Sequence, residues 1–198
     1  MRRFLSKILN PRCVYINLYN SISEIPRYFK ITNYLNKKQN FIEFNNFKKN
    51  KNFFYKIRES FLSIFISSYE KDIISILDIG GGFNNVYDFI TNSSTKKIDV
   101  TVLETQMIVD LMKPETKDIQ NLNYIEDIDY TQKNFDIIYF GTSLQYFISL
   151  EEFLSKIFKL KAKYIVIADT IFLEKRNSLI TLQINTFPSI IPQKFNNI

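Results

Sequence analysis

The stretch that decides the fold is residues 75–85, SILDIGGGFNN. An apolar run ends in Asp78 and is followed, after one residue, by Gly80, Gly81 and Gly82. Glycines at a strand-to-helix turn permit a tight turn and let a ligand approach the backbone N–H groups at the start of a helix. Three glycines can also form a plain loop, but a plain loop does not explain an acid at the end of the strand. We therefore expect a small polar ligand at this turn.

On both sides of the turn, strand-type and helix-type patterns alternate. A Ser149 cap with Glu152 three residues later marks the start of one helix. Strands buried on both faces are short and uniformly apolar. Helix spacing occurs at residues 53–66 and 150–160, and short apolar runs occur at 73–79, 100–104, 123–126, 135–140 and 164–169. This alternation predicts an α/β fold with a mainly parallel, Rossmann-like sheet and helices on both faces.

We expect two parts in the chain: residues 1–52 as a basic extension of short helices, and residues 53–198 as the ligand-binding domain. The first part contains Pro11 and Pro26 and has no sustained hydrophobic period. A helix that begins at residue 53 leads into the second part and should bury one stripe, formed by Phe54, Ile57, Phe61, Leu62, Phe65 and Ile66.

The C-terminal part contains an alternating run at residues 180–184, which predicts a further strand. The residues after it include Pro188 and Pro192, neither of which can donate a ladder hydrogen bond. One more strand fits there, so we expect the C-terminal strands of the sheet to be incomplete.

Composition excludes several classes of function. The chain has no histidine, which removes every Ser-His-Asp and Cys-His arrangement. Cys13 is the only cysteine, so no internal disulfide forms and thiolate zinc sites are excluded. The longest apolar stretch, residues 61–69, is far shorter than the ~20 residues of a membrane-spanning helix. We expect a cytoplasmic protein without a metal centre.

Charge is unevenly distributed. Residues 1–71 hold 14 Lys and Arg against 4 Asp and Glu, whereas residues 72–198 hold 12 against 16. A solvated basic face accounts for this pattern. Peripheral contact with a membrane surface, or binding of an anionic glycan, is the alternative for this N-terminal third. Nucleic-acid binding is not expected, because no recognition motif accompanies the charge.

Two cofactors compete for the glycine turn. A dinucleotide needs G-x-G-x-x-G, and Asn85 stands at the third glycine. The pattern that is met is D-x-G-x-G, with Asp78, Gly80 and Gly82, and it resembles the first motif of S-adenosylmethionine (SAM)-dependent methyltransferases. That resemblance implies an acid near the methionine moiety of SAM and glycines against its backbone. SAM has no pyrophosphate, so the missing third glycine is no obstacle.

Two more acids belong to the predicted site. Glu104 ends the second strand, where a carboxylate can accept hydrogen bonds from both ribose hydroxyls. Dinucleotide enzymes share this feature, so Glu104 supports a ligand-binding site at this edge of the sheet but does not distinguish the two cofactors. Asp127, after the third strand, resembles the methyltransferase acid near the adenine amino group, although Glu126 in this role, or a plain solvated surface acid, fits almost equally well. The predicted cofactor-binding set is therefore Asp78, Gly80, Gly81, Gly82, Glu104 and Asp127.

A finer resemblance covers most of the chain after residue 53. The segments LDIGGGF, FDIIYFGTSLQYF, KYIVIADTIF and ITLQINTFPSIIP resemble a family of bacterial SAM-dependent methyltransferases associated with surface-polysaccharide genes. The resemblance implies methylation of a hydroxyl on a small molecule or glycan. For such an acceptor, Asp169 at the end of the fifth strand or Tyr146 is a candidate to remove the proton, with a structural role as the alternative for both. The loop after residue 140 lacks the Pro-Pro motif of base N-methyltransferases. The rival functions are a non-catalytic cofactor-binding module and an NAD-dependent oxidoreductase or nucleotide-sugar enzyme.

Overall fold

The computed structural model describes residues 13–19, 21–26, 45, 57–131, 133–147, 149–170, 172, 179–185 and 190–195. The chain divides into two compact units. The larger unit consists of residues 37–144 and 149–170, and the smaller of residues 1–36, 145–148 and 171–198. The predicted boundary at residues 52 and 53 lies outside the described residues.

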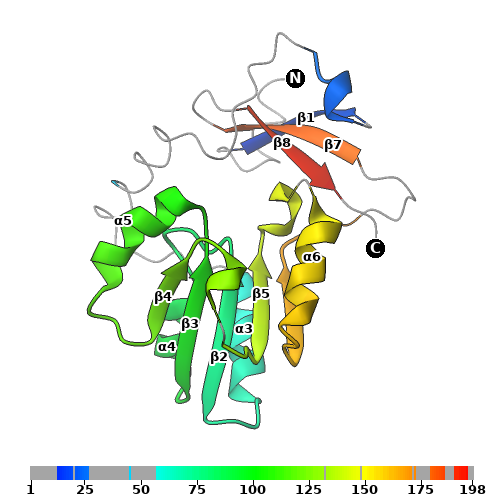
Figure 1. Ribbon diagram of the computed structural model, residues 1–198. Coiled ribbons are helices and arrows are strands. Elements are labelled where there is room, and N and C mark those ends of the chain that lie inside the picture. The colour runs from blue at the N-terminus through cyan, green and yellow to red at the C-terminus, as the bar shows by residue number, and fades with distance from the viewer. Residues whose placement is uncertain are drawn as a thin grey trace. The chain divides into compact units, whose positions relative to one another are not determined.

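The larger unit is built on a five-stranded sheet (Figure 1). All of its pairings are parallel, and β2 lies at the centre. The strand order is β4-β3-β2-β5-β6. Its strands are β2 (Ile73–Ile79), β3 (Lys97–Leu103), β4 (Leu122–Ile125), β5 (Ile137–Gly141) and β6 (Tyr164–Ala168). All five predicted strands are present, and the predicted Rossmann-like sheet is confirmed.

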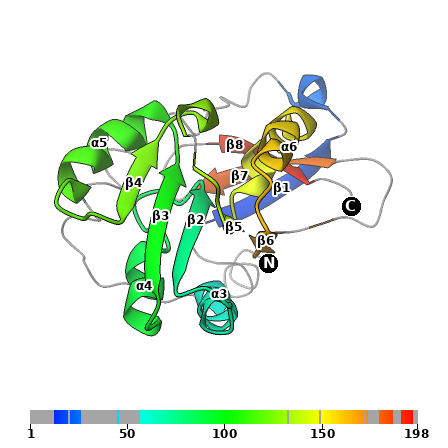
Figure 2. The ribbon, with the colours of Figure 1, turned by 60° about the horizontal axis from the view of Figure 1, so that its bottom comes forward.

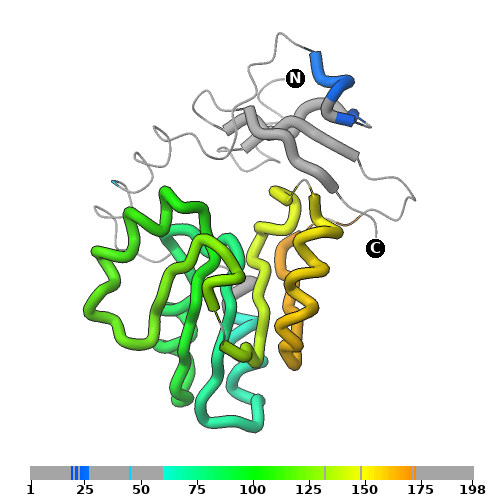
Figure 3. The backbone as a smooth tube through the Cα atoms, viewed as in Figure 1, coloured from blue at the N-terminus to red at the C-terminus, as the bar shows by residue number. Residues whose placement is uncertain are grey.

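Helices cover both faces of this sheet, as predicted. Apolar residues of α3 (Ile57–Ser67), α4 (Tyr87–Ser93) and α5 (Gln106–Thr116) share one core cluster with alternate residues of the strands. In the turned view α3 and α4 lie side by side (Figure 2). On the other face lies α6 (Leu150–Lys159), where the ring of Phe153 meets that of Phe140 in β5. Figure 3 shows how the backbone passes between these layers.

The predicted buried stripe of α3 is confirmed for Leu62 and Ile66, which are fully buried, and for Phe65, which packs against the core. It is wrong for Phe61, which is 61% exposed. Ser63 is buried instead, and its hydroxyl contacts the Ser93 hydroxyl of α4 at 2.7 Å. Ser149 precedes α6 as predicted, but its side chain makes no capping hydrogen bond. Residues 53–56 of the predicted first helix lie outside the described residues.

The smaller unit contains a three-stranded antiparallel sheet in the order β1-β7-β8. Its elements are β1 (Cys13–Tyr19), the 3-10 helix η1 (Ile22–Glu24), β7 (Leu179–Asn185) and β8 (Ile190–Phe195). The strand at 180–184 and one further strand are confirmed. The prediction of a helical N-terminus is wrong for residues 13–19, because pairing with the distant β7 makes that segment a strand. The β7–β8 pair joins β1 instead of extending the parallel sheet.

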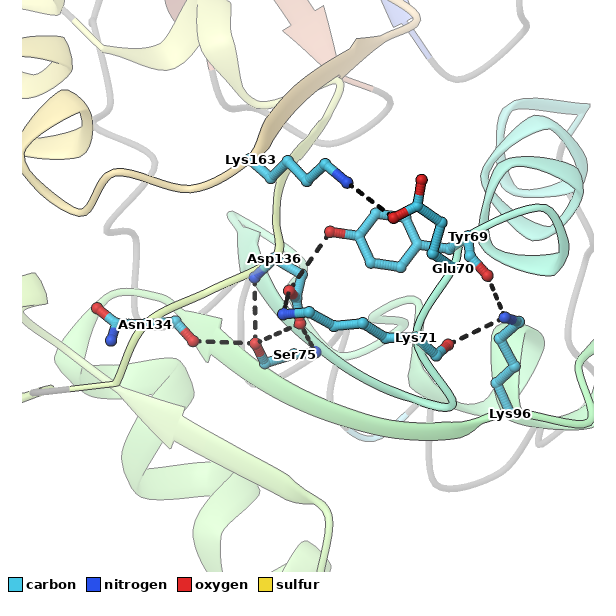
Figure 4. Close-up of polar contacts among 8 residues, drawn as sticks. All are labelled: Tyr69, Glu70, Lys71, Ser75, Lys96, Asn134, Asp136 and Lys163. Carbon is cyan, nitrogen blue, oxygen red and sulfur yellow. Dashed lines mark hydrogen bonds and ion pairs between the residues drawn. The ribbon is translucent and has the colours of Figure 1, made fainter.

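A polar cluster ties the amino ends of β2 and β5 together (Figure 4). Asp136 accepts hydrogen bonds from the Ser75 N–H at 3.0 Å and the Ser75 hydroxyl at 3.1 Å, and it forms an ion pair with Lys71 at 2.5 Å. Burial raises the pKa of Asp136, but the hydrogen bonds from Lys71 and Ser75 outweigh it and the net pKa is lowered. Asp136 therefore has a structural role, at the end of the sheet opposite the glycine turn.

Candidate functional site

The glycine turn follows β2 at the carboxyl edge of the parallel sheet. Gly80 has a φ of +72° and Gly82 a φ of +63°, a left-handed region that disfavours side chains. The Gly80 N–H donates to the Leu103 carbonyl of β3 at 2.9 Å. A Cβ on Gly80 would lie 2.5 Å from the Cβ of Ser143, in the loop after β5. The turn is thus fitted between the ends of β3 and β5.

Asp78 lies beneath this turn and is 1% exposed. Its Oδ2 accepts a hydrogen bond at 3.1 Å from the N–H of Val86, the residue that caps the start of α4. A Cβ on Gly81 would lie only 2.3 Å from the same oxygen. The carboxylate therefore occupies the space that any side chain at position 81 would need, and glycine is required there.

Glu104 lies at the end of β3, beside the turn. Its Oε1 accepts from the Gly82 N–H at 3.0 Å, and its Oε2 accepts from the Thr105 N–H at 2.8 Å. Burial raises the pKa of Glu104, against the opposing effect of these two N–H groups. The structure therefore brings Asp78, the glycines and Glu104 together at one edge of the sheet, as the sequence predicted.

Two further residues of the site were missed by sequence analysis. Tyr124 of β4 is fully buried, and its hydroxyl donates to the Gly82 carbonyl at 3.0 Å. The same hydroxyl accepts from the Asn85 amide at 2.7 Å, and the Asn85 Oδ1 accepts from the Tyr87 N–H at 2.8 Å. The sequence shows Tyr124 only as one aromatic residue in an apolar run. Its role depends on the order of strands in the sheet, which residue spacing does not reveal.

Asp127 lies just after β4 and is partly buried. Its Oδ1 accepts a hydrogen bond at 3.1 Å from the Asp129 N–H and caps the 3-10 helix η2 (Ile128–Tyr130). The adenine contact predicted for Asp127 remains a prediction. One carboxylate oxygen of Asp127 thus caps the helix. This geometry does not decide whether Asp127 or Glu126 is the acid near the adenine.

Two of the three described non-glycine residues with positive φ lie at the carboxyl edge; the third, Lys161, precedes β6. Thr142 follows β5 with a φ of +67°, and Asp169 follows β6 with a φ of +53°. Residues other than glycine in this region are uncommon, and such strain gathers at functional sites. Asp169 thus lies at the same edge of the sheet as the glycine turn. Tyr146, in the 3-10 helix η3 (Leu144–Tyr146), belongs to the smaller unit.

In this arrangement the N–H groups of Gly82 and Val86 both donate to carboxylates. In a dinucleotide site such groups bind the pyrophosphate. The turn therefore presents negative charge and hydrogen-bond acceptors. Within the described ranges, no three His, Cys, Asp or Glu side chains are grouped to hold a metal ion. No helix in the described part of the chain has the length and hydrophobicity to cross a membrane.

Comparison with known proteins was made by sequence and by structure. No protein-family model matches the sequence, and no protein with a curated description matches it. The structure of a DhpI–SAM–HEP complex resembles this chain with a TM-score of 0.51 at 10% identity, over 81% of this chain and 80% of DhpI. This likeness covers most of both chains and supports the assignment of the fold.

Two further solved structures have lower TM-scores. A SAM-dependent methyltransferase from Aquifex aeolicus has a TM-score of 0.48 at 15% identity, over 61% of this chain and 68% of that protein. The plantazolicin methyltransferase BpumL, in complex with a pentazolic desmethylPZN analog and SAH, has a TM-score of 0.43 at 20% identity. That match covers 63% of this chain and 52% of BpumL, so the chain spans only about half the length of BpumL.

Proposed function

We propose that this chain is a SAM-dependent methyltransferase that methylates a hydroxyl group of a small molecule or glycan. The observation that carries the proposal is the pair of buried carboxylates at the glycine turn. Asp78 and Glu104 end neighbouring strands, and each accepts a hydrogen bond from a backbone N–H of the β2–α4 connection.

Asp78 distinguishes SAM from a dinucleotide. A pyrophosphate needs the N–H groups at a helix start, where the Val86 N–H already donates to Asp78, and it carries negative charge that Asp78 would repel. SAM carries a sulfonium and an ammonium cation, which two carboxylates attract. An ionised carboxylate has about four lone-pair positions, so Glu104 can accept ribose hydroxyls in addition to its two N–H groups. The residues therefore fit SAM.

When bound, SAM supplies an electrophilic methyl group. The chain itself then has to hold the acceptor in line with that methyl group and exclude water. For a hydroxyl acceptor, we propose Asp169, at the same edge of the sheet as the glycine turn, as the group that takes the proton. The shared fold of DhpI, whose structure is a complex with SAM and HEP, supports this cofactor. The resemblance to methyltransferases associated with surface-polysaccharide genes supports a glycan or small-molecule acceptor.

Calorimetric titration with SAM, its demethylated product and NAD tests the cofactor. We expect both sulfur compounds to bind and NAD to bind weakly or not at all. Glu104→Ala should weaken SAM binding about 10- to 100-fold, the scale of about 1.5–3 kcal/mol for hydrogen bonds to a charged group. Asp99→Ala is the matched control, because Asp99 lies at the other end of β3 and pairs with Lys133. Tighter binding of NAD than of SAM would contradict the proposal.

Methyl transfer is tested separately from binding. Radiolabelled SAM is incubated with hydroxyl-bearing sugars and small molecules, and the labelled product is separated. Transfer to a hydroxyl supports the proposal. SAM binding without transfer to any acceptor favours the alternative, a non-catalytic module that has kept the cofactor site.

A further inference from the structure

The two edges of the parallel sheet differ in how they are protected. Exposed edges of sheets are commonly blunted by short strands, charges or proline, because their backbone groups can pair with another chain. The β4 edge is short and has Asn123 as its exposed residue. The β6 edge lacks both charge and proline: the strand from Tyr164 to Ala168 contains no charged residue and no proline.

Side chains of β6 are exposed to an unusual degree for a strand of this sheet. Tyr164, Ile165 and Ile167 are 39%, 36% and 41% exposed, whereas the first four residues of β5 are buried. Among the described strands, β6 pairs with β5 alone. The next strand in the chain, β7, already has β1 on one side and β8 on the other.

Backbone hydrogen bonds show which residues of β6 face away from β5. The Tyr164 N–H donates to the Asp136 carbonyl at 3.1 Å, and the Ala168 carbonyl accepts from the Thr142 N–H at 3.0 Å. Backbone groups alternate in direction along a strand. The N–H and carbonyl groups of Ile165 and Ile167 therefore point to the outer edge.

The sequence across this edge is complementary to itself. Lys163 precedes β6 and Asp169 follows it, so the strand is positive at one end and negative at the other. Lys163 also forms a solvent-exposed ion pair with Glu70 at 3.6 Å, a weak contact that a second copy can replace. In an antiparallel pair of two copies centred on Val166, Lys163 of each copy lies beside Asp169 of the other. The same register pairs Ile165 with Ile167, the two residues whose backbone groups point outward. A symmetric pair of this kind is isologous and closed.

We propose that two copies of this chain associate through β6, which pairs antiparallel with β6 of the second copy about a two-fold axis at Val166. The two five-stranded sheets then become one continuous sheet of ten strands. Ile165 and Ile167 of both copies lie on one face of it and form an apolar cluster. This contact is small, so the dimer is weak and depends on protein concentration.

Sedimentation and light scattering on the full chain give the first test. We expect the mass to rise from 23.6 kDa toward twice that value as the concentration increases. Ile167→Lys should weaken the dimer at least tenfold, because lysine at this edge opposes pairing. Ile73→Lys is the matched control: Ile73 is 59% exposed but begins the central strand β2, so the dimer should be unchanged. A monomer at every concentration, or a dimer insensitive to Ile167→Lys, overturns the proposal.

Charge reversal is the test that does not depend on the apolar residues. Lys163→Asp and Asp169→Lys should each weaken the dimer, and the double variant should restore it. Failure of the double variant to restore the dimer contradicts the charge pairing.

A cross-link tests the register. With Cys13→Ser as background, Val166→Cys should form a disulfide between copies, because position 166 faces itself in a pair without mutual hydrogen bonds. Ile165→Cys faces position 167 and should not cross-link. The reverse pattern contradicts the register.

Discussion

At the scale of single residues, both backbone polar groups of Gly82 are hydrogen-bonded to side chains. Its N–H donates to Glu104 and its carbonyl accepts from Tyr124, so strands β3 and β4 both fix the turn that follows β2. The Asn85 amide donates to the Tyr124 hydroxyl, and its oxygen accepts from the Tyr87 N–H at the start of α4. The conformation of the glycine turn therefore depends on buried polar side chains as well as on the glycines.

Tyr124→Phe tests this dependence. The substitution leaves the Gly82 carbonyl and the Asn85 amide without their hydroxyl partner, which should lower the free energy of unfolding by about 1–3 kcal/mol. Urea denaturation measures this loss, and SAM titration should show weaker binding in the folded variant. Tyr130→Phe is the control, since Tyr130 is 69% exposed. Unchanged stability and binding would show that the hydroxyl does not support the turn.

Gly81→Ala should destabilise the protein by about 1–3 kcal/mol, because its Cβ overlaps the Asp78 carboxylate, and overpacking has costs of this size. In an Asp78→Ala background the overlap is gone, so a double-mutant cycle should give a clear coupling energy. Gly82→Ala is the control, since its Cβ would approach no atom closer than 4.0 Å and only its positive φ is unfavourable. Additive effects of Gly81→Ala and Asp78→Ala would contradict the overlap.

At the scale of elements, Asp136 joins the amino ends of β2 and β5 and should make stability depend on pH. Its pKa is lowered from 3.8 in the folded state, so its contribution is fully present above 3.8. The contribution is lost as the pH falls through the lower, folded-state pKa. Lys71 is 62% exposed and solvent screens that ion pair, so the hydrogen bonds from Ser75 contribute most.

Asp136→Asn should therefore lower the free energy of unfolding by about 1–3 kcal/mol at neutral pH. The difference from the natural chain should shrink below pH 3.8. Urea denaturation across this pH range measures it. Asp99→Asn is the control, because Asp99 forms only a solvent-exposed ion pair with Lys133 and contributes little to the free energy of unfolding. A difference that grows toward acid would reverse the sign of the predicted linkage.

Elements could be predicted from the sequence where a local pattern determines them. Strands such as β2 are short apolar runs that are buried on both faces. Asp78 and Glu104 could be placed at the site because each stands at the carboxyl end of a predicted strand. The role of Tyr124 and the exposure of Phe61 in α3 could not be predicted, because both depend on which element packs alongside. β1 was missed for the same reason, since its partner β7 lies far along the chain.

At the scale of the whole molecule, the sheet of the smaller unit is assembled from segments that precede and follow the larger unit in the chain. Cys13 pairs with Asn185, so this contact closes a loop that contains the entire parallel sheet. Closing a flexible loop costs more entropy as it lengthens. When the larger unit is folded, most of that loop is already ordered, so less entropy is lost on closing it. The β1–β7 pairing should therefore depend on the folded larger unit, whereas folding of the larger unit should not depend on the β1–β7 pairing.

This asymmetry leads to a prediction for hydrogen exchange. Ile76 is fully buried in the central strand β2, so Ile76→Ala should destabilise the larger unit by about 2–5 kcal/mol and speed exchange in both sheets. Leu182→Pro, in the middle of β7, removes a ladder hydrogen bond and should speed exchange in β1 and β8 while leaving β2 and β3 unchanged. Leu182→Ala, which keeps its N–H, is the matched control. Faster exchange of β2 in Leu182→Pro would show that the two sheets unfold as one cooperative unit. Slow exchange of β1 in Ile76→Ala would show that the smaller unit folds independently. Either result would contradict the one-way dependence.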